Sequence, residues 1–255
     1  MPEFAGAGTA LSTGGFDEAS HACGVGSPEI WSVISVETSG CGFLPDRRPK
    51  LLFERHIFHR LTDGQFDADD PDISQPTAGG YGAGGAHQYD RLAAAIQLDR
   101  NVALQSASWG MGQIMGENFK AAGFASVEDM IAAMVQSEDT QLLGMAKFVL
   151  ANGMGEPLLN HDWAGFARRY NGPNFASNDY DGKLHSSYQR YADGGLPNLR
   201  VRAAQIYLRY KGFPNLAVDG VMGPSTAAAA SQFQQSIGAP ETGIIDDNLI
   251  TQLLT

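Results

Sequence analysis

The first clear hydrophobic pattern in the chain begins at residue 27. The segment Ser27-Pro28-Glu29 has the residue types of a helix start, with serine as the cap, proline at the first helical position and an acid in the first turn. One face of this predicted helix carries Ile30, Val33, Ile34 and Glu37 at i, i+3, i+4, i+7 spacing. Gly40 and Gly42 then end it. The pattern predicts a helix that is apolar on one face except for a single carboxylate.

The rest of the first 192 residues favours helix over strand. Residues 49–61 (PKLLFERHIFHRL) are strongly apolar and fit either a strand or a helix, and the acidic, glycine-rich stretch 63–85 predicts a long loop. Residues 1–26 are rich in Gly, Ala, Ser and Thr without periodicity, so we expect a loose N-terminal segment. Further helices are predicted over 90–105, 112–122, 127–150 and 162–170. The fold class expected for 27–192 is mainly α, with at most a small β-hairpin.

A change in composition marks a second domain. Residues 193–198 (DGGLPN) are turn-rich and predict a linker. Beyond it, residues 220–226 (GVMGPST) and 243–249 (GIIDDNL) each have a glycine turn, an apolar pair and a helix start. We expect residues 199–255 to form a three-helix domain of marginal size. We also expect the part before residue 193 to fold without it.

Composition and charge exclude several classes of function. The net charge is −11, and because residues 196–255 hold four basic and four acidic side chains, the excess of acid lies in the larger part. A surface that acidic does not suit nucleic acid. The chain has no apolar run of about 18 residues and no secretory signal pattern, so we expect no membrane insertion. Cys23 and Cys41 are expected to be free thiols, although they could pair with each other.

Glu37 is the most informative candidate for chemistry. It shares the apolar face of its helix, where burial of a carboxylate is costly and raises its pKa. A carboxyl group that keeps its proton near neutral pH suits a general acid. The alternative is that the helix frays near Val36 and that Glu37 simply reaches water.

A second carboxylate, Glu54, lies in the apolar run 51–55. Glycoside hydrolysis uses two carboxyl groups, one that protonates the leaving oxygen and one that activates water or attacks the sugar. Asp46, in the turn between the two glutamates, is a third candidate. Taken alone, Glu54 is better explained by an ion pair with a neighbouring arginine.

Two further motifs combine glycines with polar side chains. In residues 106–115 (SASWGMGQIM), two glycines bracket a methionine beside Trp109 and Gln113, which suits a tight turn that brings backbone close to a ligand. In residues 169–175 (RYNGPNF), Tyr170 and Asn171 follow a predicted helix. Both motifs also have structural explanations, as an ordinary glycine turn and an Asn-Gly-Pro helix stop.

Taken together, the motifs resemble those of a known family. Residues 37–40 (ETSG), 108–115 (SWGMGQIM) and 170–172 (YNG) occur in the order and rough spacing of goose-type lysozymes and soluble lytic transglycosylases. More closely, 52–58 (LFERHIF), the WGMGQIMG segment and RYNGP resemble the N-acetylmuramidase family found in phage endolysins, over about residues 26–192. Thr38 stands where the lysozyme motif more often has Ser, a departure that leaves the catalytic residues unaffected.

The resemblance implies a lysozyme-like fold and the role of each site residue. Glu37 is implied to be the general acid, and Glu54 is the preferred second carboxylate. The residues implied to line the sugar subsites are Ser108, Gln113, Met115, Tyr170 and Asn171. We expect no cofactor and no metal.

The C-terminal domain resembles the three-helix peptidoglycan-binding module. The module's signature Asp-Gly-x-x-Gly-Pro-x-Thr reads here as 219–226 (DGVMGPST). The second half-repeat keeps Gly243 but departs from the pattern at Asp246 and Leu249, so the first half-repeat is the preferred binding site. The implied wall-binding residues are Asp219, Gly220 and Thr226.

The sequence therefore predicts a peptidoglycan hydrolase that cleaves the β-1,4 bond between N-acetylmuramic acid and N-acetylglucosamine. The partner we expect is bacterial peptidoglycan. We expect an antibacterial, bacteriolytic monomer that stays in the host bacterial cytoplasm until it is released to the wall. Three alternatives remain open. They are a lytic transglycosylase that uses Glu37 alone, a metal-dependent wall peptidase or amidase that uses Glu54, His56 and His59, and a non-catalytic wall-binding protein. The spacing of the histidines is not that of a His-Glu-x-x-His zinc site.

Overall fold

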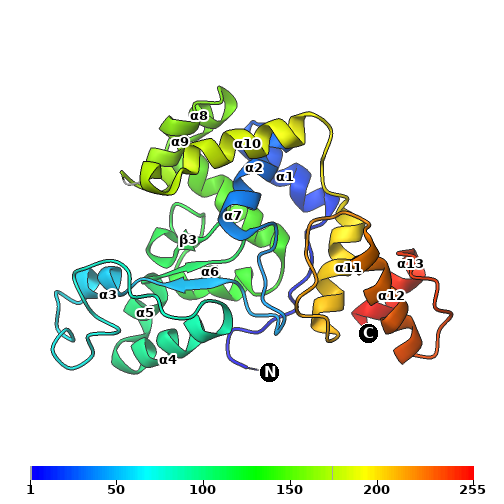
Figure 1. Cartoon of the computed structure of the whole chain (residues 1–255). Helices are drawn as coiled ribbons and strands as arrows, with labels where there is room; N and C mark the ends of the chain where they lie inside the picture. The colour runs from blue at the N-terminus through cyan, green and yellow to red at the C-terminus, as the bar shows by residue number, and fades with distance from the viewer. Residues whose placement is uncertain (1, 174) are drawn as a thin grey trace.

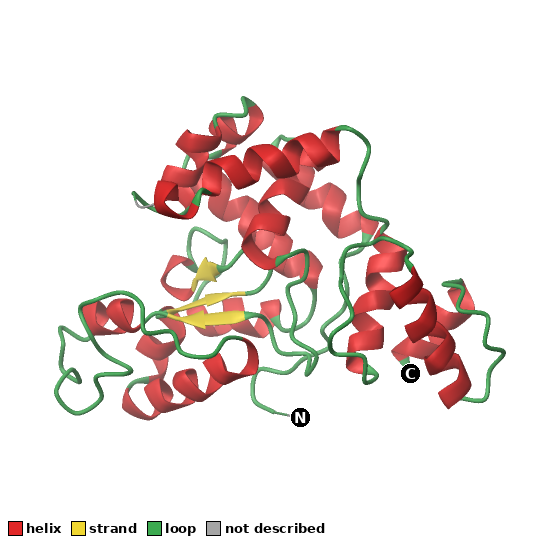
Figure 2. Ribbon diagram, viewed as in Figure 1, coloured by secondary structure: helices red, strands yellow, loops and turns green. Residues whose placement is uncertain are grey.

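A computed structural model describes residues 2–173 and 175–255, and it is mainly helical with one small sheet (Figures 1 and 2). The helices of the first part are α1 (Thr13–Cys23), α2 (Ser27–Thr38), α3 (Arg55–Leu61), α4 (Gln88–Leu98), α5 (Arg100–Gln105), α6 (Val127–Met134), α7 (Glu138–Ala151), α8 (Gly155–Leu159), α9 (Trp163–Tyr170) and α10 (Tyr180–Ala192). Short 3-10 helices are η1 (Gly85–His87), η2 (Gly116–Asn118) and η3 (Phe175–Asn178). The sheet lies between α8–α10 on one side and α3–α5 on the other (Figure 1).

The expectation of a loose segment over residues 1–26 is wrong, because this segment contains α1. The Ser12 hydroxyl accepts a hydrogen bond from the Gly15 N–H and caps the helix. The buried Phe16 ring stacks on Trp31 of α2 with ring centroids 5.4 Å apart. Small residues allow α1 to pack closely along α7, so the composition that suggested a loose segment belongs to a core helix.

Helix α2 confirms the first predicted helix and sets the position of Glu37. Its cap is Gly26 rather than Ser27, which is the first helical residue. At its other end Ser39 adopts a left-handed conformation with φ 53°, and the Ser39 N–H bonds the Ser35 carbonyl. Glu37 therefore lies in the last turn of the helix.

The sheet is antiparallel, in the order β1 (Leu51–Phe53), β2 (Ala107–Trp109), β3 (Ile114–Met115). The ambiguous segment 49–61 is thus a strand followed by α3. The helix predicted over 112–122 is wrong, since this stretch forms β3 and η2. Met115 pairs with Ser108 across the sheet, and a Cβ at Gly116 would come within 2.1 Å of the Leu104 carbonyl oxygen.

Two predicted helices are each divided in two by a capping residue. Asp99 interrupts the helix predicted over 90–105, and its side chain accepts from the Val102 N–H at the start of α5. Ser137 interrupts the helix predicted over 127–150, and its side chain caps α7 by accepting from the Thr140 N–H. The helix over 162–170 is confirmed as α9, whereas α10, which packs along α2, was not predicted.

The C-terminal residues form α11 (Leu199–Tyr210), α12 (Pro224–Ser236) and α13 (Asp247–Leu254), which group together on one side of the molecule (Figure 1). The repeat seen in the sequence has a structural counterpart. The Gln205 side chain accepts from the Gly220 N–H, and the Gln234 side chain accepts from the Gly243 N–H, both at 2.8 Å. This group has its own hydrophobic core, but Ala10 and Cys41 of the larger part also belong to it.

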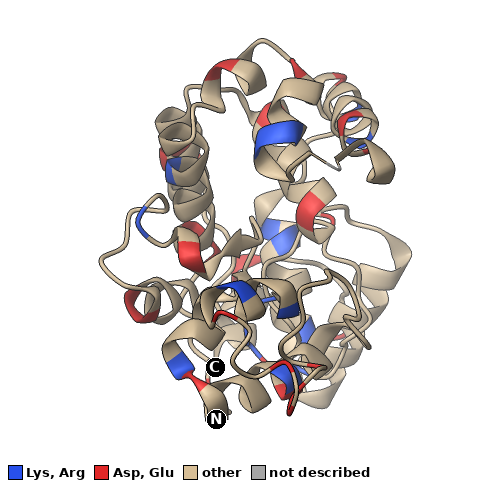
Figure 3. Cartoon of the chain, turned by 90° about the vertical axis from the view of Figure 1, so that its left-hand side faces the viewer, with Lys and Arg blue, Asp and Glu red and all other residues tan. Residues whose placement is uncertain are grey.

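Within the described residues, no helix is both long and apolar enough to cross a membrane. Cys23 and Cys41 are both buried and unpaired, as expected. On the face shown in Figure 3, basic and acidic positions are interspersed rather than collected into one basic surface.

Candidate active site

Glu37 lines a cleft of about 320 Å³ between the end of α2 and the sheet. The other residues around this cleft are Thr38, Ser39, Leu44, Lys50, Leu51, Leu52, Gly85 and Gln113. The cleft therefore joins the last turn of α2, strand β1, the turn before β3 and the end of the glycine-rich loop. It brings together Glu37 and Gln113, which the sequence motifs place 76 residues apart.

Burial raises the pKa of Glu37 to about 8, from an ordinary value of 4.5. The Asn171 side chain lies beside this carboxyl group and lowers the pKa, but it only partly offsets the effect of burial. The Asn171 amide nitrogen is itself buried and has no hydrogen-bond partner of good geometry. A raised pKa favours the protonated form of Glu37 at neutral pH, the form in which a carboxyl group can act as a general acid.

Gln113 is fixed at the base of the cleft by its own turn. Its side-chain amide donates to the Gly110 carbonyl at 2.8 Å and accepts from the Ser108 hydroxyl at 3.0 Å. Its backbone is held at φ 47°, an unusual conformation for a residue other than glycine, which is often found at functional sites. A Cβ at Gly112 would meet the Met145 side chain at 2.7 Å, so this glycine is needed for close packing.

The predicted subsite residues therefore have different positions. Gln113 reaches the cleft, Ser108 is buried and donates its hydroxyl to Gln113, and Met115 pairs with Ser108 in the sheet. Tyr170 is not among the residues that line the cleft. Its hydroxyl donates to the Gly112 carbonyl at 2.6 Å, and Glu37 is close enough to help burial raise the tyrosine's pKa.

Glu54 follows directly after β1, and only 15% of its side chain is exposed. Leu51 and Leu52 of β1 both border the cleft, whereas Glu54, just beyond the strand, is not among the residues that line it. Its Oε1 accepts from the Tyr81 hydroxyl at 3.2 Å, and its Oε2 lies 3.1 Å from His56 Nδ1. Burial raises the pKa of Glu54, while His56, Tyr81 and Arg91 oppose this shift.

The remaining candidates are held in other contacts. Asp46 forms an ion pair with Arg48 at 2.6 Å and does not border the cleft. His59 pairs with Asp67 at 2.8 Å, whereas His56 faces Glu54. The three residues proposed as a metal set are therefore divided between two separate pairs. In the described parts of the chain, no group of three or more His, Cys, Asp or Glu side chains is arranged to hold a metal ion.

The sequence did not reveal three residues near the carboxylates. Tyr180 of α10 has its pKa raised by burial and then by Glu37 and Tyr81, so it lies near both the general-acid candidate and the partner of Glu54. Lys50 borders the cleft and donates to the Thr38 carbonyl. Tyr81 lies in the glycine-rich loop, anchored where the Gln88 amide donates to its carbonyl. Of the three, only Tyr81 had a sequence signal, its position in the glycine-rich stretch 63–85.

The predicted wall-binding residues surround Gln205 of α11. Thr226 is only 4% exposed and accepts from the Gln205 amide at 3.1 Å. Gly220 is also buried, with a backbone φ of 71°. Asp219 is exposed, although its Oδ1 accepts from Gln205 and from the Val221 N–H. Of the three, Asp219 alone presents a side chain to solvent.

Comparisons with known proteins match each of the two parts of the chain to a family. Residues 26–192 match the N-acetylmuramidase family, and residues 198–253 match a peptidoglycan binding domain. Among solved structures, the chain is similar to one described as the crystal structure of Burkholderia AP3 phage endolysin. The identity is 40% and the TM-score 0.66, with 72% of each chain covered. No curated protein sequence matches the chain.

The mainly helical fold, the match to the muramidase family and the C-terminal peptidoglycan-binding module together define a peptidoglycan-cleaving hydrolase. The chain belongs to the N-acetylmuramidase family.

Proposed function

We propose that this enzyme hydrolyses the β-1,4 bond between N-acetylmuramic acid and N-acetylglucosamine, with Glu37 as the general acid. The observation that carries the proposal is the raised pKa of Glu37, about 8, in a cleft that is open to a ligand. Glu37 donates its proton to the glycosidic oxygen as the bond to the sugar C1 breaks. Gln113 lines the same cleft and the Asn171 side chain lies beside the Glu37 carboxyl group, so both are suited to contact polar substituents of the sugars.

Glu54 is the second carboxylate in this proposal. It removes a proton from water while the water oxygen attacks C1 from the opposite face of the sugar, so the anomeric configuration is inverted. The Tyr81 hydroxyl and His56 stabilise its ionised form against the effect of burial. Burial still raises the pKa of Glu54 overall, so in this proposal Glu54 acts as the base at a pH above the ordinary range of a glutamate.

A lytic transglycosylase reaction is the second candidate. In that reaction the 6-hydroxyl of the muramic acid attacks C1 in place of water, Glu37 acts first as acid and then as base, and a 1,6-anhydro ring forms. The position of Tyr180, close to Glu37 and Tyr81, favours this candidate, since a tyrosine side chain helps to exclude water. Glu54 then has a structural role.

The biological role we propose is that of an endolysin. Such an enzyme accumulates as a monomer in the cytoplasm of the host bacterium and degrades the wall after release. The similarity to a phage endolysin at 40% identity supports this role. The peptidoglycan-binding module supports contact with the wall polymer. The carboxylate chemistry needs no cofactor.

Digestion of purified peptidoglycan in H₂¹⁸O, followed by mass spectrometry of the products, tests the proposal. Hydrolysis predicts a reducing muramic acid end that carries one heavy oxygen. Products that are lighter by one water and contain no heavy oxygen would instead assign the transglycosylase reaction. The initial anomer ratio, measured by NMR, tests whether Glu54 gives inversion.

A further inference from the structure

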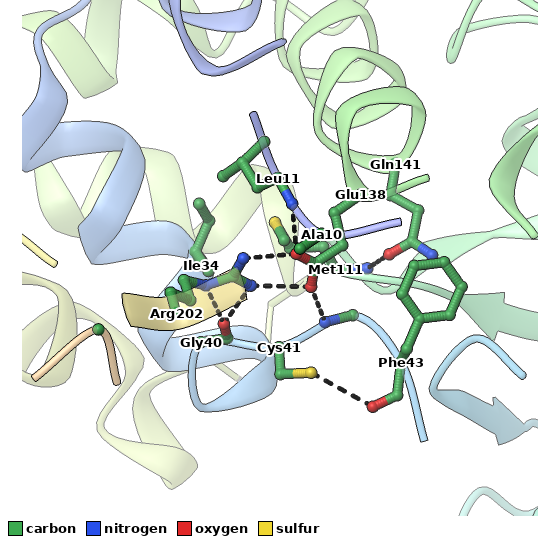
Figure 4. Close-up of polar contacts among 12 residues, drawn as sticks. Ala10, Leu11, Ile34, Gly40, Cys41, Phe43, Met111, Glu138, Gln141 and Arg202 are labelled. Atoms are coloured by element: carbon green, nitrogen blue, oxygen red, sulfur yellow. Dashed lines mark hydrogen bonds and ion pairs between the residues drawn. The ribbon is translucent and has the colours of Figure 1, made fainter. Parts of the chain in front are cut away.

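A buried ion pair connects the C-terminal module to the larger part of the chain (Figure 4). Arg202 of α11 points away from its own module towards Glu138 at the start of α7. The guanidinium Nη1 lies 2.5 Å from Glu138 Oε2, and Nη2 lies 2.8 Å from Oε1. Both residues are 0% exposed. This two-point contact has the geometry of the strongest charge-assisted hydrogen bonds.

The same guanidinium group holds the chain just beyond Glu37. Arg202 Nε and Nη2 donate to the Gly40 carbonyl oxygen at 2.9 and 2.5 Å. The partner carboxylate of Glu138 accepts from the Gly42 N–H at 2.8 Å and from the Leu11 N–H at 2.9 Å. The ion pair therefore fixes the turn 40–42 from both of its sides, only three residues after the general-acid candidate.

The turn is also held by backbone bonds, since the Lys50 N–H donates to the Gly42 carbonyl at 2.8 Å and the Cys41 N–H to the Thr38 carbonyl at 3.4 Å. Ser39, between the end of α2 and the turn, adopts a left-handed conformation, which is costly for a residue other than glycine. The Lys50 side chain donates to the Thr38 carbonyl on the cleft side. Ser39 also borders both the cleft and a second cavity of about 460 Å³ at the junction of the two parts, which Arg202 and Asp219 help to line.

Other contacts place the module firmly against the same region. The Ala10 N–H donates to the Tyr207 hydroxyl at 3.1 Å, and the Tyr210 hydroxyl donates to the Gly8 carbonyl at 2.9 Å. Without the module, the buried Glu138 would lose the only cation that it contacts among the described residues. A buried charge without its partner is strongly destabilising. The expectation that the part before residue 193 folds without the module therefore does not follow from this structure.

We propose that Arg202 is a positioning residue for catalysis: through Gly40, the wall-binding module fixes the end of α2 and with it the orientation of Glu37. The module is then a structural part of the catalytic cleft as well as a contact to the wall. This inference rests on the proposed role of Glu37 as general acid.

The substitution Arg202→Lys in the full-length protein tests the proposal. Lysine keeps the positive charge next to Glu138 but is a point charge without the planar fork, so it cannot hold Glu138 and Gly40 together in the same way. On soluble glycan fragments, which need no attachment to an insoluble wall, we expect kcat to fall about ten- to a hundredfold, the size of effect seen when catalytic groups are slightly misplaced. KM should change by less than about twofold, because the substrate contacts are retained.

Two further variants keep the test decisive. Arg200→Lys is the matched control, because Arg200 lies on the same helix and forms an exposed pair with Asp247; its kcat should equal that of the wild type. If Arg202→Lys does not fold, Arg202→Met combined with Glu138→Met replaces the ion pair by apolar side chains, a change that proteins often tolerate. The same fall in kcat is then expected for the double variant.

A folded Arg202→Lys protein, or a folded double variant, with wild-type kcat on soluble fragments would overturn the proposal. The failure of this proposal and that of the general-acid assignment are distinguishable. If Glu37→Gln is inactive while Arg202→Lys is fully active, only the positioning role is wrong. If Glu37→Gln is itself active, the proposed function is wrong.

Discussion

The Tyr170 hydroxyl donates a 2.6 Å hydrogen bond to the carbonyl oxygen of Gly112. This bond joins the end of α9 to the turn that carries Gln113, two segments that are 58 residues apart in the sequence. The tyrosine ring packs between Phe148 and Phe166, with centroid distances of 5.7 and 5.2 Å. Tyr170 thus holds the turn whose next residue, Gln113, lines the cleft.

Tyr170→Phe should remove this bond and leave the ring packing intact. We expect a loss of about 1 kcal/mol in the free energy of unfolding, a typical net value for one hydrogen bond. The kcat should also fall, because the turn that carries Gln113 is less firmly held. Tyr188→Phe is the matched control, since that ring packs on His161 and Trp163. Denaturant unfolding and kcat on soluble glycan are the measurements, and equal results for both variants would argue against the role of Tyr170.

The pH dependence of the wild-type rate should be bell-shaped. Glu37 works in its protonated form, so kcat/KM should fall as the pH rises through about 8, where this group loses its proton. Glu54 works in its ionised form, so the rate should also fall on the acidic side, at a pH above the ordinary range of a glutamate because burial raises its pKa. A rate that stays constant well above pH 8, with the protein still folded, would contradict a general acid at Glu37.

The free energy of unfolding of the wild type should depend on pH through Glu37, and Glu37→Gln should remove this dependence. The pKa of Glu37 is about 8 in the folded protein against an ordinary 4.5, so between these values the folded state binds more protons than the unfolded state. The contribution of the protonated group is complete below pH 4.5 and is lost as the pH rises through about 8. Relative to the wild type, Glu37→Gln should therefore gain stability over this range, as measured by denaturant unfolding at several pH values. A constant difference would show that burial does not shift this group.

Glu54→Gln and Tyr81→Phe together test the water-activating role. Loss of the base should reduce kcat by about 10²–10⁴-fold. The hydrogen bond from the Tyr81 hydroxyl to Glu54 Oε1 lowers the pKa of this carboxyl group. Tyr81→Phe removes only this bond, so the pKa of Glu54 should rise and the acidic limb of the rate profile should move to higher pH. A near-normal rate in Glu54→Gln would remove Glu54 from the mechanism and favour the transglycosylase reaction.

Local patterns predicted much of the fold. The amphipathic spacing of Ile30, Val33 and Ile34 identified α2, and the capping preferences of Ser and Pro located its start to within one residue. The repeated glycine turns identified the C-terminal module, in which Gly220 and Gly243 have equivalent hydrogen bonds. These features depend on neighbours in sequence, which is why the pattern was sufficient.

Features that depend on tertiary packing were not predicted. Segment 112–122 has the composition of a helix, but pairing of Met115 with Ser108 makes its first part the short strand β3, which η2 follows. Helix α1 was missed because its core-facing residues are mostly small. The role of Arg202 was not predicted, since a sequence cannot show that its partner is Glu138, 64 residues earlier.

The candidate site was predicted in part. Glu37 was identified because a carboxylate on an apolar helix face is unusual, and Gln113 because it follows closely spaced glycines; the structure brings both into one cleft. Tyr180 and Lys50 gave no such signal, since their positions depend on how α10 packs on α2 and where the chain turns before β1.

The activity of Glu37→Gln on purified peptidoglycan tests the central claim most directly. Glutamine is nearly isosteric with glutamate but cannot donate the proton, so the folded variant should retain about 1% or less of the wild-type rate. Glu29→Gln is the matched control: it removes a carboxylate from the same helix, next to His161 and outside the cleft, and should leave most of the activity. If Glu37→Gln keeps more than about a tenth of the wild-type rate, general acid catalysis by Glu37 is contradicted.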